Sequence, residues 1–201
     1  MLNLVLFGGP GSGKGTQSDR LIDRYGLHHI STGEVLRGHI SRGDELGQIA
    51  NEYISQGHLI PDELMIRVLE NVLDSNPELV KNGVIFDGFP RTINQAKALK
   101  EMMARRGSKI HAVIGLEVPD EELTARMINR GKETGRADDN ENTIRERLNV
   151  YHSQTAPLRE YYISEGKYHP VNGHGSVDDV FERIGSSLHE RVPEIMEDFK
   201  K

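Results

Sequence analysis

The stretch LFGGPGSGKGTQ near the start of the chain places five glycines and one cation between an apolar run and a polar one. Its spacing, Gly8-x-x-x-x-Gly13-Lys14, suits a loop whose backbone N–H groups turn inward around phosphates while the lysine reaches the outer phosphates. A helix that begins at this loop would add the partial positive charge of its N-terminus. The residue after Lys14 is Gly15, and the hydroxyl comes one place later, at Thr16. We predict a phosphate-binding loop; a glycine-rich turn without a ligand is the alternative.

Other charged residues fit the same chemistry. Asp87 ends the apolar run VIFD, and an acid at that place beside a phosphate loop helps to hold Mg²⁺, often through water. Arg126 and Arg130 are four residues apart, which puts them on one face of a helix. A loose phosphoryl-transfer transition state needs several donors around its spread negative charge. A solvated basic face is the alternative, but the chain is acidic overall. The remaining candidate donors are Arg37, Arg91, Arg136 and Arg147.

The composition is that of an acidic globular chain of 201 residues, with a net charge of −6 and 36% hydrophobic residues. This length allows one sizeable domain, and the acidic balance argues against a general nucleic-acid-binding surface. Without cysteine there are no disulfides or thiolate metal sites, and the nine histidines lack paired metal spacing. No run approaches a membrane span, and the apolar start lacks the basic region of a signal peptide. We expect a cytoplasmic protein without membrane or nucleic-acid partners.

The elements that would position these residues alternate along the chain. Short apolar runs predict buried strands at 2–7, 84–86 and 112–118, with weaker candidates at 27–32 and 167–172. Helical spacing predicts helices at 140–162 and 177–188, and the polar tail after residue 188 is expected to be peripheral. Such alternation implies right-handed βαβ units and a parallel sheet. Two stretches, 33–61 and 129–139, do not fit the alternation and are expected to stand off the sheet.

The motifs together resemble those of the nucleoside monophosphate kinases, most closely the adenylate kinase family. They follow one another in the family's order over residues 2–188 and read GGPGSGKGTQ, HISTGEVLR, GHLIPDEL, FDGFPRTINQA, ARMINRGKETGRADDNENTIRERL and VNGHGSVDDV. The resemblance implies a phosphate-loop, three-layer α/β fold with a central parallel sheet of five strands. The implied activity is reversible, Mg²⁺-dependent phosphoryl transfer from ATP to AMP, which gives two ADP and maintains the adenine nucleotide balance. The implied form is a monomer.

The resemblance also implies a role for individual residues. The catalytic set would be Lys14, Arg91, Arg130, Arg136 and Arg147. The ATP site would be formed by Gly11, Ser12, Gly13, Lys14, Gly15, Thr16, Arg126, Arg130 and Gly175. The AMP site would be formed by Thr32, Arg37, His58, Leu59, Ile60, Gly88, Phe89, Pro90, Arg91, Gln95, Arg136 and Arg147. Asp87 would act on Mg²⁺ through water.

The same resemblance implies that the chain is divided into three parts. Residues 1–30, 61–128 and 140–201 would form the core phosphate-loop domain, residues 31–60 the AMP-binding domain, and residues 129–139 a short lid. Long-lid relatives insert a small subdomain there, sometimes with zinc held by cysteines; this chain has the short form, and no structural zinc is expected. Gly131 and Gly135 bracket the lid loop and are candidate hinges.

Three other functions stay open at this point. A pyrimidine (UMP/CMP) monophosphate kinase usually has alanine in place of Thr32 and asparagines after FPR, where this chain has Thr92 and Gln95. A glutamine amide can pair with the N1 and N6 edge of adenine, which favours AMP. A GTPase-like switch would need an NKxD guanine motif, and the sequence has none. A catalytically silent nucleotide-binding scaffold would not need Lys14 and the complete arginine set.

Overall fold

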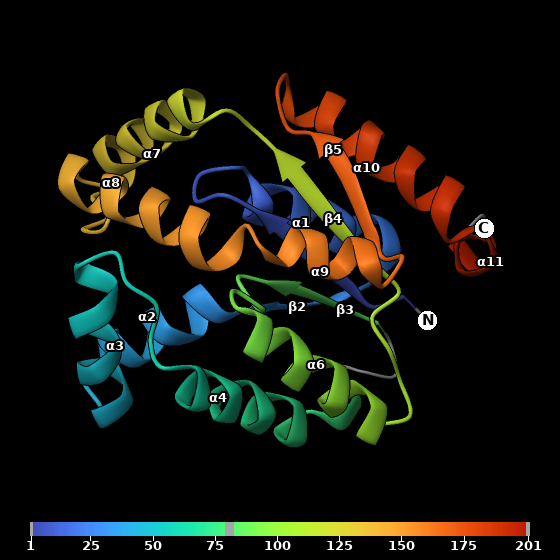
Figure 1. Cartoon of the computed structure of the whole chain (residues 1–201), viewed down its shortest axis with the longest axis horizontal. Helices are drawn as coiled ribbons and strands as arrows, with labels where there is room; N and C mark the ends of the chain where they lie inside the picture. Colours follow the sequence, from blue (N-terminus) through green and yellow to red (C-terminus); the bar gives the residue numbers. More distant parts are fainter. Residues whose placement is uncertain (1, 79–82, 200–201) are drawn as a thin grey trace.

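The structure is a computed structural model that describes residues 2–78 and 83–199 (Figure 1). The core domain predicted from sequence includes residues 1, 79–82, 200 and 201, which lie outside the described residues. The strands are β1 (Leu4–Gly8), β2 (His28–Ser31), β3 (Val84–Asp87), β4 (Ala112–Glu117) and β5 (Tyr168–Asn172). The helices are α1 (Lys14–Tyr25), α2 (Thr32–Arg42), α3 (Glu45–Ser55), α4 (Asp62–Ser75), α6 (Ile93–Arg105), α7 (Asp120–Thr134), α8 (Glu141–Val150), α9 (Leu158–Ser164), α10 (Val177–Arg191) and α11 (Pro193–Met196). A π-helical turn, η1 (Tyr151–Thr155), and a 3₁₀ turn, η2 (Glu197–Phe199), complete them.

The five strands form one parallel sheet in the order β2-β3-β1-β4-β5. In the register, Leu6 of β1 lies opposite Asp87 of β3 and Ile114 of β4. The expected fold class is therefore confirmed, and both weaker strand candidates, β2 and β5, belong to the sheet. Because every strand runs the same way, all their carboxyl ends meet at one edge, where open α/β sheets bind ligands.

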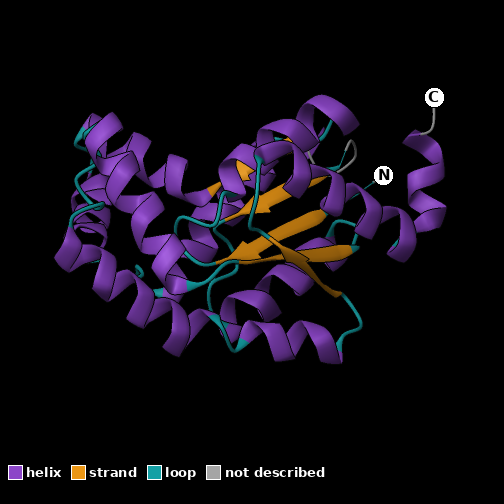
Figure 2. Cartoon of the chain, turned by 90° about the horizontal axis from the view of Figure 1, so that it is seen from above, coloured by secondary structure: helices purple, strands orange, loops and turns teal. Residues whose placement is uncertain are grey.

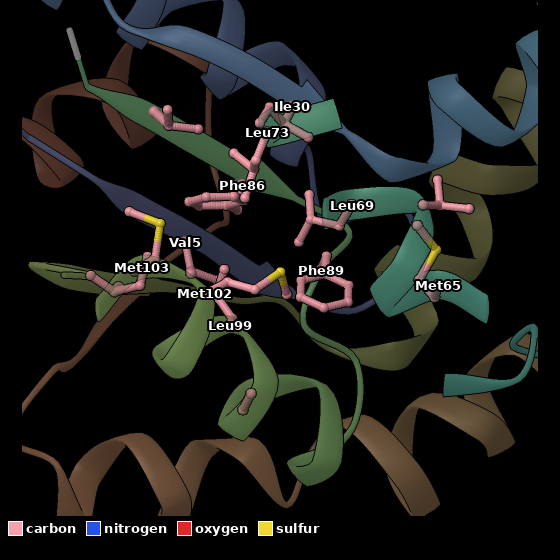
Figure 3. Packing of buried hydrophobic residues seen from close by; sticks show 14 of the residues in the cluster. Val5, Ile30, Met65, Leu69, Leu73, Phe86, Phe89, Leu99, Met102 and Met103 are labelled. Atoms are coloured by element: carbon pink, nitrogen blue, oxygen red, sulfur yellow. The ribbon is translucent and has the colours of Figure 1, made fainter. Parts of the chain in front are cut away.

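Helices cover both faces of the sheet, and the strands are buried on each side (Figure 2). Side chains alternate along β1: Val5 and Phe7 join one core cluster, whereas Leu4 and Leu6 join the other. The first cluster includes residues of α4 and α6, and in Figure 3 Phe86 and Phe89 lie among the methionines and leucines of these helices. The second cluster joins α1 and α10. The result is the three-layer arrangement that brings the β1–α1 loop to the carboxyl edge.

The helix predicted over 140–162 is divided into three parts in the structure. α8 ends at Val150, the π-helical turn η1 follows, and α9 begins at Leu158. The widened turn is closed by the N–H of Ala156, which donates to the carbonyl of Tyr151 at 2.7 Å. Pro157 follows directly, and its ring has no N–H with which to continue the regular hydrogen bonds. The apolar periodicity predicted helical structure over this range, but the prediction of a single continuous helix was wrong.

The C-terminal tail is not peripheral, in contrast to the expectation from its polar composition. Met196 is fully buried in the cluster that joins α1 and α10. The ring of Phe199 meets that of Tyr25 edge-on, with 5.3 Å between the centroids. The few apolar residues of the tail therefore complete the core under α1.

Replacing Met196 with alanine is expected to lower the free energy of unfolding by about 2–5 kcal/mol, because a buried side chain is lost and a cavity remains. For a chain of this size each kcal/mol corresponds to about 2–4 °C in Tm. Thermal unfolding followed by circular dichroism measures the effect. Glu194→Ala, at an exposed position of the same short helix, is the matched control. An unchanged Tm in Met196→Ala would contradict the packing of the tail.

Within the described residues, no helix is both long and apolar enough to cross a membrane.

Candidate functional site

The glycine loop joins β1 to α1 at the carboxyl edge of the sheet. Gly13 is the N-cap residue of α1 and has φ of +93°, a backbone conformation that side-chain-bearing residues rarely adopt. A Cβ at Gly8 would lie 2.7 Å from the hydroxyl of Ser12, so this position also requires glycine. The loop therefore folds tightly enough to point the N-terminus of α1 into the space above the sheet.

Lys14 is the first residue of α1, and its side chain folds back over this loop. Its Nζ donates to the carbonyl oxygens of Gly8 and Gly9, each at 3.0 Å. Burial lowers the pKa of Lys14 to about 8, against the attraction of Asp87 and with the repulsion of Arg91. The ammonium is therefore held in place but under-neutralised, and a phosphate would supply the missing negative charge.

This pKa predicts a pH dependence of ATP binding. The free protein loses the Lys14 proton above pH 8, whereas bound phosphate favours the charged form and raises the pKa. The dissociation constant for ATP should therefore rise by only about twofold between pH 7 and 8, and above pH 8 by up to about tenfold per pH unit. Isothermal titration calorimetry between pH 7 and 9.5 measures it. In Lys14→Arg, whose charge persists at these values, the rise should be absent; an equal rise would assign the titration to another group.

Asp87 ends β3 beside the loop, and His29 of β2 faces it with Nε2 and Oδ2 3.4 Å apart. Burial alone would raise the pKa of Asp87, but His29 and Lys14 hold it below its ordinary range. The same contact raises the pKa of His29, against the effect of its own burial. Asp87 is thus kept as a carboxylate at the floor of the site. His29 is the first residue of the motif HISTGEVLR, but the sequence analysis gave it no role, because a histidine in a strand does not by itself indicate a carboxylate partner.

Three arginines of the predicted cluster meet two adjacent carboxylates. Arg130 forms a bidentate pair with Asp139 at 2.6 and 2.8 Å, and Arg136 forms one with Asp138 at 2.6 and 3.0 Å. Arg147 joins the two pairs, with 2.7 Å to Asp139 and 3.1 Å to Asp138. The Asp139 side chain is fully buried. The sequence analysis gave neither aspartate a role in the site. Their position in the chain, between Arg136 and Arg147, could have indicated that they pair with these arginines.

The cations of the site are only partly neutralised. Burial lowers the pKa of Arg147 to about 10, with Asp138 acting against it and Arg136 with it. Burial likewise lowers the pKa values of Arg91 and Arg37, and each is lowered further by the other arginines. The cavity at this site is lined by seven cationic side chains, Lys14 and six arginines, and by two carboxylates, Glu34 and Asp87. The arrangement therefore favours a ligand with several negative charges.

Arg126 has a different environment from the other arginines. It forms an ion pair with Glu122 on the same helix and donates to the carbonyl of Gly173 at 2.9 Å. A longer contact of 3.4 Å reaches the carbonyl of Ser12 in the glycine loop. Arg126 therefore links α7, the glycine loop and the segment that follows β5.

One cavity of about 610 Å³ is lined by most of these groups. Its walls contain every residue predicted for the ATP site and, from the AMP set, Arg37, Leu59, Gly88, Pro90, Arg91, Arg136 and Arg147. A second, narrower cavity of about 70 Å³ adds Thr32, His58, Ile60 and Gln95. Phe89 lines neither cavity, because its side chain is buried in the core. Asp87 lies in the wall of the larger cavity.

The second cavity ends at a hydrogen-bonded group of polar side chains. The hydroxyl of Thr32 donates to the carbonyl of Gly88 at 2.9 Å. The buried amide of Gln95 accepts from the N–H of Arg91 and donates to Asp62, each at 2.8 Å. Asp62 lies in the motif GHLIPDEL, but the sequence analysis gave it no role, because it is one of many acidic residues in an acidic chain.

The two glycines of the lid segment differ in structure. Gly135 ends α7 in a left-handed conformation, with φ of +67°. Gly131 lies inside α7, where an added Cβ would come within 2.8 Å of the carbonyl oxygen of Asp139. Gly131 therefore serves close packing, and the loop between the helices spans residues 135–140. In the described residues, no cluster of three or more histidine, aspartate or glutamate side chains is placed to hold a metal ion.

Phosphate-loop kinases hold polyphosphates with a lysine at a helix N-terminus and with several arginines that face it. Here Lys14 faces partly buried arginines across the cavity, and this fold and site define that class. The family model for adenylate kinase matches residues 6–167. Adenylate kinase of Bacteroides fragilis is 59% identical over 184 residues, which are 92% of this chain and 96% of that protein. The Phocaeicola vulgatus enzyme is 57% identical over 188 residues, 94% and 98% of the two chains, and that of Porphyromonas gingivalis 50% over 184 residues, 92% and 94%. The chain belongs to the adenylate kinase family.

The chain is therefore a nucleoside monophosphate kinase, an enzyme that transfers a phosphoryl group. The resemblance inferred from the motifs is confirmed, and the comparisons support adenylate kinase rather than the pyrimidine alternative.

Proposed function

We propose that this site binds ATP and AMP together and transfers the γ-phosphoryl group of ATP to AMP, reversibly, to give two ADP. The observation that carries the proposal is the excess of positive charge around the larger cavity, which is lined by Lys14 and six arginines but by two carboxylates, Glu34 and Asp87. Two nucleotides that share one cavity bring their phosphate chains together there, and their negative charges complement this excess.

In this proposal, residues 11–16 hold the ATP phosphates, while Arg126 and the backbone at Gly175 lie beside the rest of ATP. Thr32, Arg37 and the 58–60 segment hold AMP, and Gln95 pairs with its base. Segments 31–60 and 129–139 act as the AMP-binding domain and the lid, and residues 1–30, 61–128 and 140–201 as the core. The cavity linings described above support this assignment.

The chemistry needs no protein base, because a phosphate oxygen of AMP is already ionised at neutral pH. This oxygen attacks the γ-phosphorus, the bond from that phosphorus to the β–γ bridging oxygen breaks, and ADP leaves with the bridging oxygen. Lys14, Arg91, Arg130, Arg136 and Arg147 hold the two phosphate chains in line and neutralise the charge spread over the transferring group. These residues also replace water around the phosphates, which limits hydrolysis.

We infer that the reaction uses Mg²⁺, and the residues present fit it. Asp87 is a carboxylate at the wall of the cavity, and Thr16 adds a hydroxyl at the start of α1. Mg²⁺ prefers oxygen ligands, keeps several waters and is held through one or two carboxylates together with substrate phosphates. Asp87 would hold it through water. When bound, the ion neutralises charge on the phosphate oxygens.

A coupled assay of ADP formation from ATP, AMP and Mg²⁺ tests the proposal. We expect turnover with AMP well above that with UMP or CMP, and its loss when EDTA is added. Greater turnover of UMP or CMP than of AMP would overturn the assignment of the base pocket. We also propose that the protein is a cytoplasmic monomer; light scattering after size-exclusion chromatography tests its mass against 22.6 kDa.

A further inference from the structure

Asp62, at the start of α4, accepts hydrogen bonds from one residue of α6 and from the residue that caps the N-terminus of α6. Its Oδ1 accepts from the Gln95 amide nitrogen, and its Oδ2 accepts from the hydroxyl of Thr92, each at 2.8 Å. Thr92 is also the N-cap residue of α6, where it accepts from the backbone N–H of Gln95 at 3.2 Å. The carboxylate therefore fixes the Gln95 side chain and the turn that carries it.

The partners of Gln95 determine which way its amide faces. A carboxylate only accepts hydrogen bonds, so the atom opposite Asp62 must be Nε2. The backbone N–H of Arg91 only donates, so the atom opposite it must be Oε1, and that distance is 2.8 Å. Turning the amide over would set oxygen against carboxylate and N–H against N–H. Because Gln95 is only 2% exposed, water could not relieve either mismatch.

The amide keeps one N–H and one oxygen lone pair beyond these two bonds. Adenine offers a matching edge, since its N1 accepts and its 6-amino group donates. A 6-oxopurine offers the reverse, because its N1 carries a proton and its oxygen accepts. With the amide fixed, and with the base held one way round by its ribose and phosphate, Gln95 can pair with the first edge and not with the second.

We propose that Asp62 is a specificity-determining residue, which selects a 6-aminopurine monophosphate over a 6-oxopurine monophosphate by fixing the orientation of the Gln95 amide. Asp62 is a positioning residue in this scheme, since it acts through Gln95 and not on the substrate. The inference rests on the proposed function, namely that Gln95 pairs with the base of AMP.

The test is the ratio of kcat/KM for AMP to that for IMP, with ATP as donor. In Asp62→Ala the amide keeps only its Arg91 contact, and we expect this ratio to fall at least tenfold. The fall should come from a higher KM for AMP and a lower KM for IMP, with kcat for AMP within about threefold of the unchanged protein. Asp62→Asn still offers an oxygen to Nε2, so it should keep most of the ratio.

Two controls separate positioning from structure. Glu63→Ala removes a neighbouring acid from the first turn of the same helix, at an exposed position, and should leave the ratio unchanged. The Tm of each variant, measured by thermal unfolding, reports how much the substitution destabilises the folded protein. If Asp62→Ala lowers kcat/KM for AMP and IMP equally and the ratio stays, Asp62 is only structural and the inference is overturned.

Gln95→Leu distinguishes failure of this inference from failure of the proposed function. Both require that this variant lose the preference for AMP over IMP. If it keeps the preference, Gln95 does not read the base, and the proposed base pocket fails together with the inference. If Gln95→Leu loses the preference while Asp62→Ala keeps it, the pocket stands and the role of Asp62 alone is overturned.

Discussion

Lys14→Met is expected to lower kcat by about 10² to 10³-fold, the loss found when a preorganised group that stabilises transition-state charge is removed. The ammonium lies at the N-terminus of α1, held over the loop by the Gly8 and Gly9 carbonyls. In the proposed mechanism it meets the outer phosphates, where charge shifts during transfer. An interaction that strengthens in the transition state affects kcat, whereas uniform binding would change KM alone.

The same substitution should leave the fold intact. The lowered pKa of Lys14 means that the folded protein disfavours its charged form, so removing the charge relieves that cost. Methionine is also unbranched and has a similar length, so it can occupy the same space. We expect a Tm equal to or above that of the unchanged protein, in contrast to the loss of turnover.

Steady-state kinetics at saturating ATP and AMP measure this effect. Lys97→Met, at an exposed position of α6, is the matched control and should retain full kcat. Near-normal turnover in Lys14→Met would contradict the role of the glycine loop in transfer. A loss of turnover together with a marked fall in Tm would instead assign the effect to folding.

The sequence predicted the sheet because its strands are buried on both faces. Runs such as VIFD and AVIGLE contain hardly any polar residue, and a fully buried strand is the simplest structure for them. The glycine loop was equally readable, since the positive φ values at Gly11 and Gly13 are conformations that glycine adopts at little cost. Where the backbone geometry allows few residue types at a position, a single sequence is enough to predict the local structure.

The carboxylates that position the site were not predictable in this way. Asp62 and Asp139 are adjacent to their partners only after folding: Asp62 lies 33 residues from Gln95 along the chain, and Asp139 lies eight from Arg147. Asp62 lies in the motif GHLIPDEL and Asp139 in the motif ARMINRGKETGRADDNENTIRERL. Neither motif by itself shows which of the 31 acidic residues of the chain orients an arginine or an amide and which faces water. The buried tail residue Met196 was missed because the segment around it, EIMEDFKK, is mostly polar and too short to show a periodicity.

A bisubstrate mimic that joins two adenosines through five phosphates is expected to bind at least about 10²-fold more tightly than ATP or AMP alone. Once one end is bound, the other is held near its own site at a high effective concentration. Its five phosphates would also contact Lys14 and the arginines at the same time. The mimic would therefore supply all the negative charge that complements the cations of the larger cavity. Isothermal titration calorimetry with the mimic, ATP and AMP compares the three affinities.

Tight binding should be accompanied by closure of two segments. The proposed AMP-binding segment, residues 31–60, contacts α8 in this structure. The hydroxyl of Thr143 donates to the carbonyl of Ser55 at 3.3 Å, and His58 faces Glu146 at 3.3 Å. Figure 1 shows α3 and α8 at the same end of the molecule. Both contacts are partly exposed and few in number, so each is weak in the absence of a ligand. We therefore expect the free protein to separate these segments readily and the mimic to hold them together.

Spin labels on Glu52→Cys in α3 and Glu133→Cys in α7 report this motion, and the absence of native cysteine makes the labelling specific. When the mimic saturates the protein, the mean distance between the two labels should decrease, and the distribution of distances should become narrower. A pair on Asp23→Cys and Glu182→Cys, in α1 and α10, lies within the core and should not change. Arg130, Arg136 and Arg147 already share Asp138 and Asp139, so phosphates that draw in one of them must move the others with it. If the mimic binds tightly and the first distance stays the same, the two segments are rigid, and closure does not bring the arginines to the phosphates.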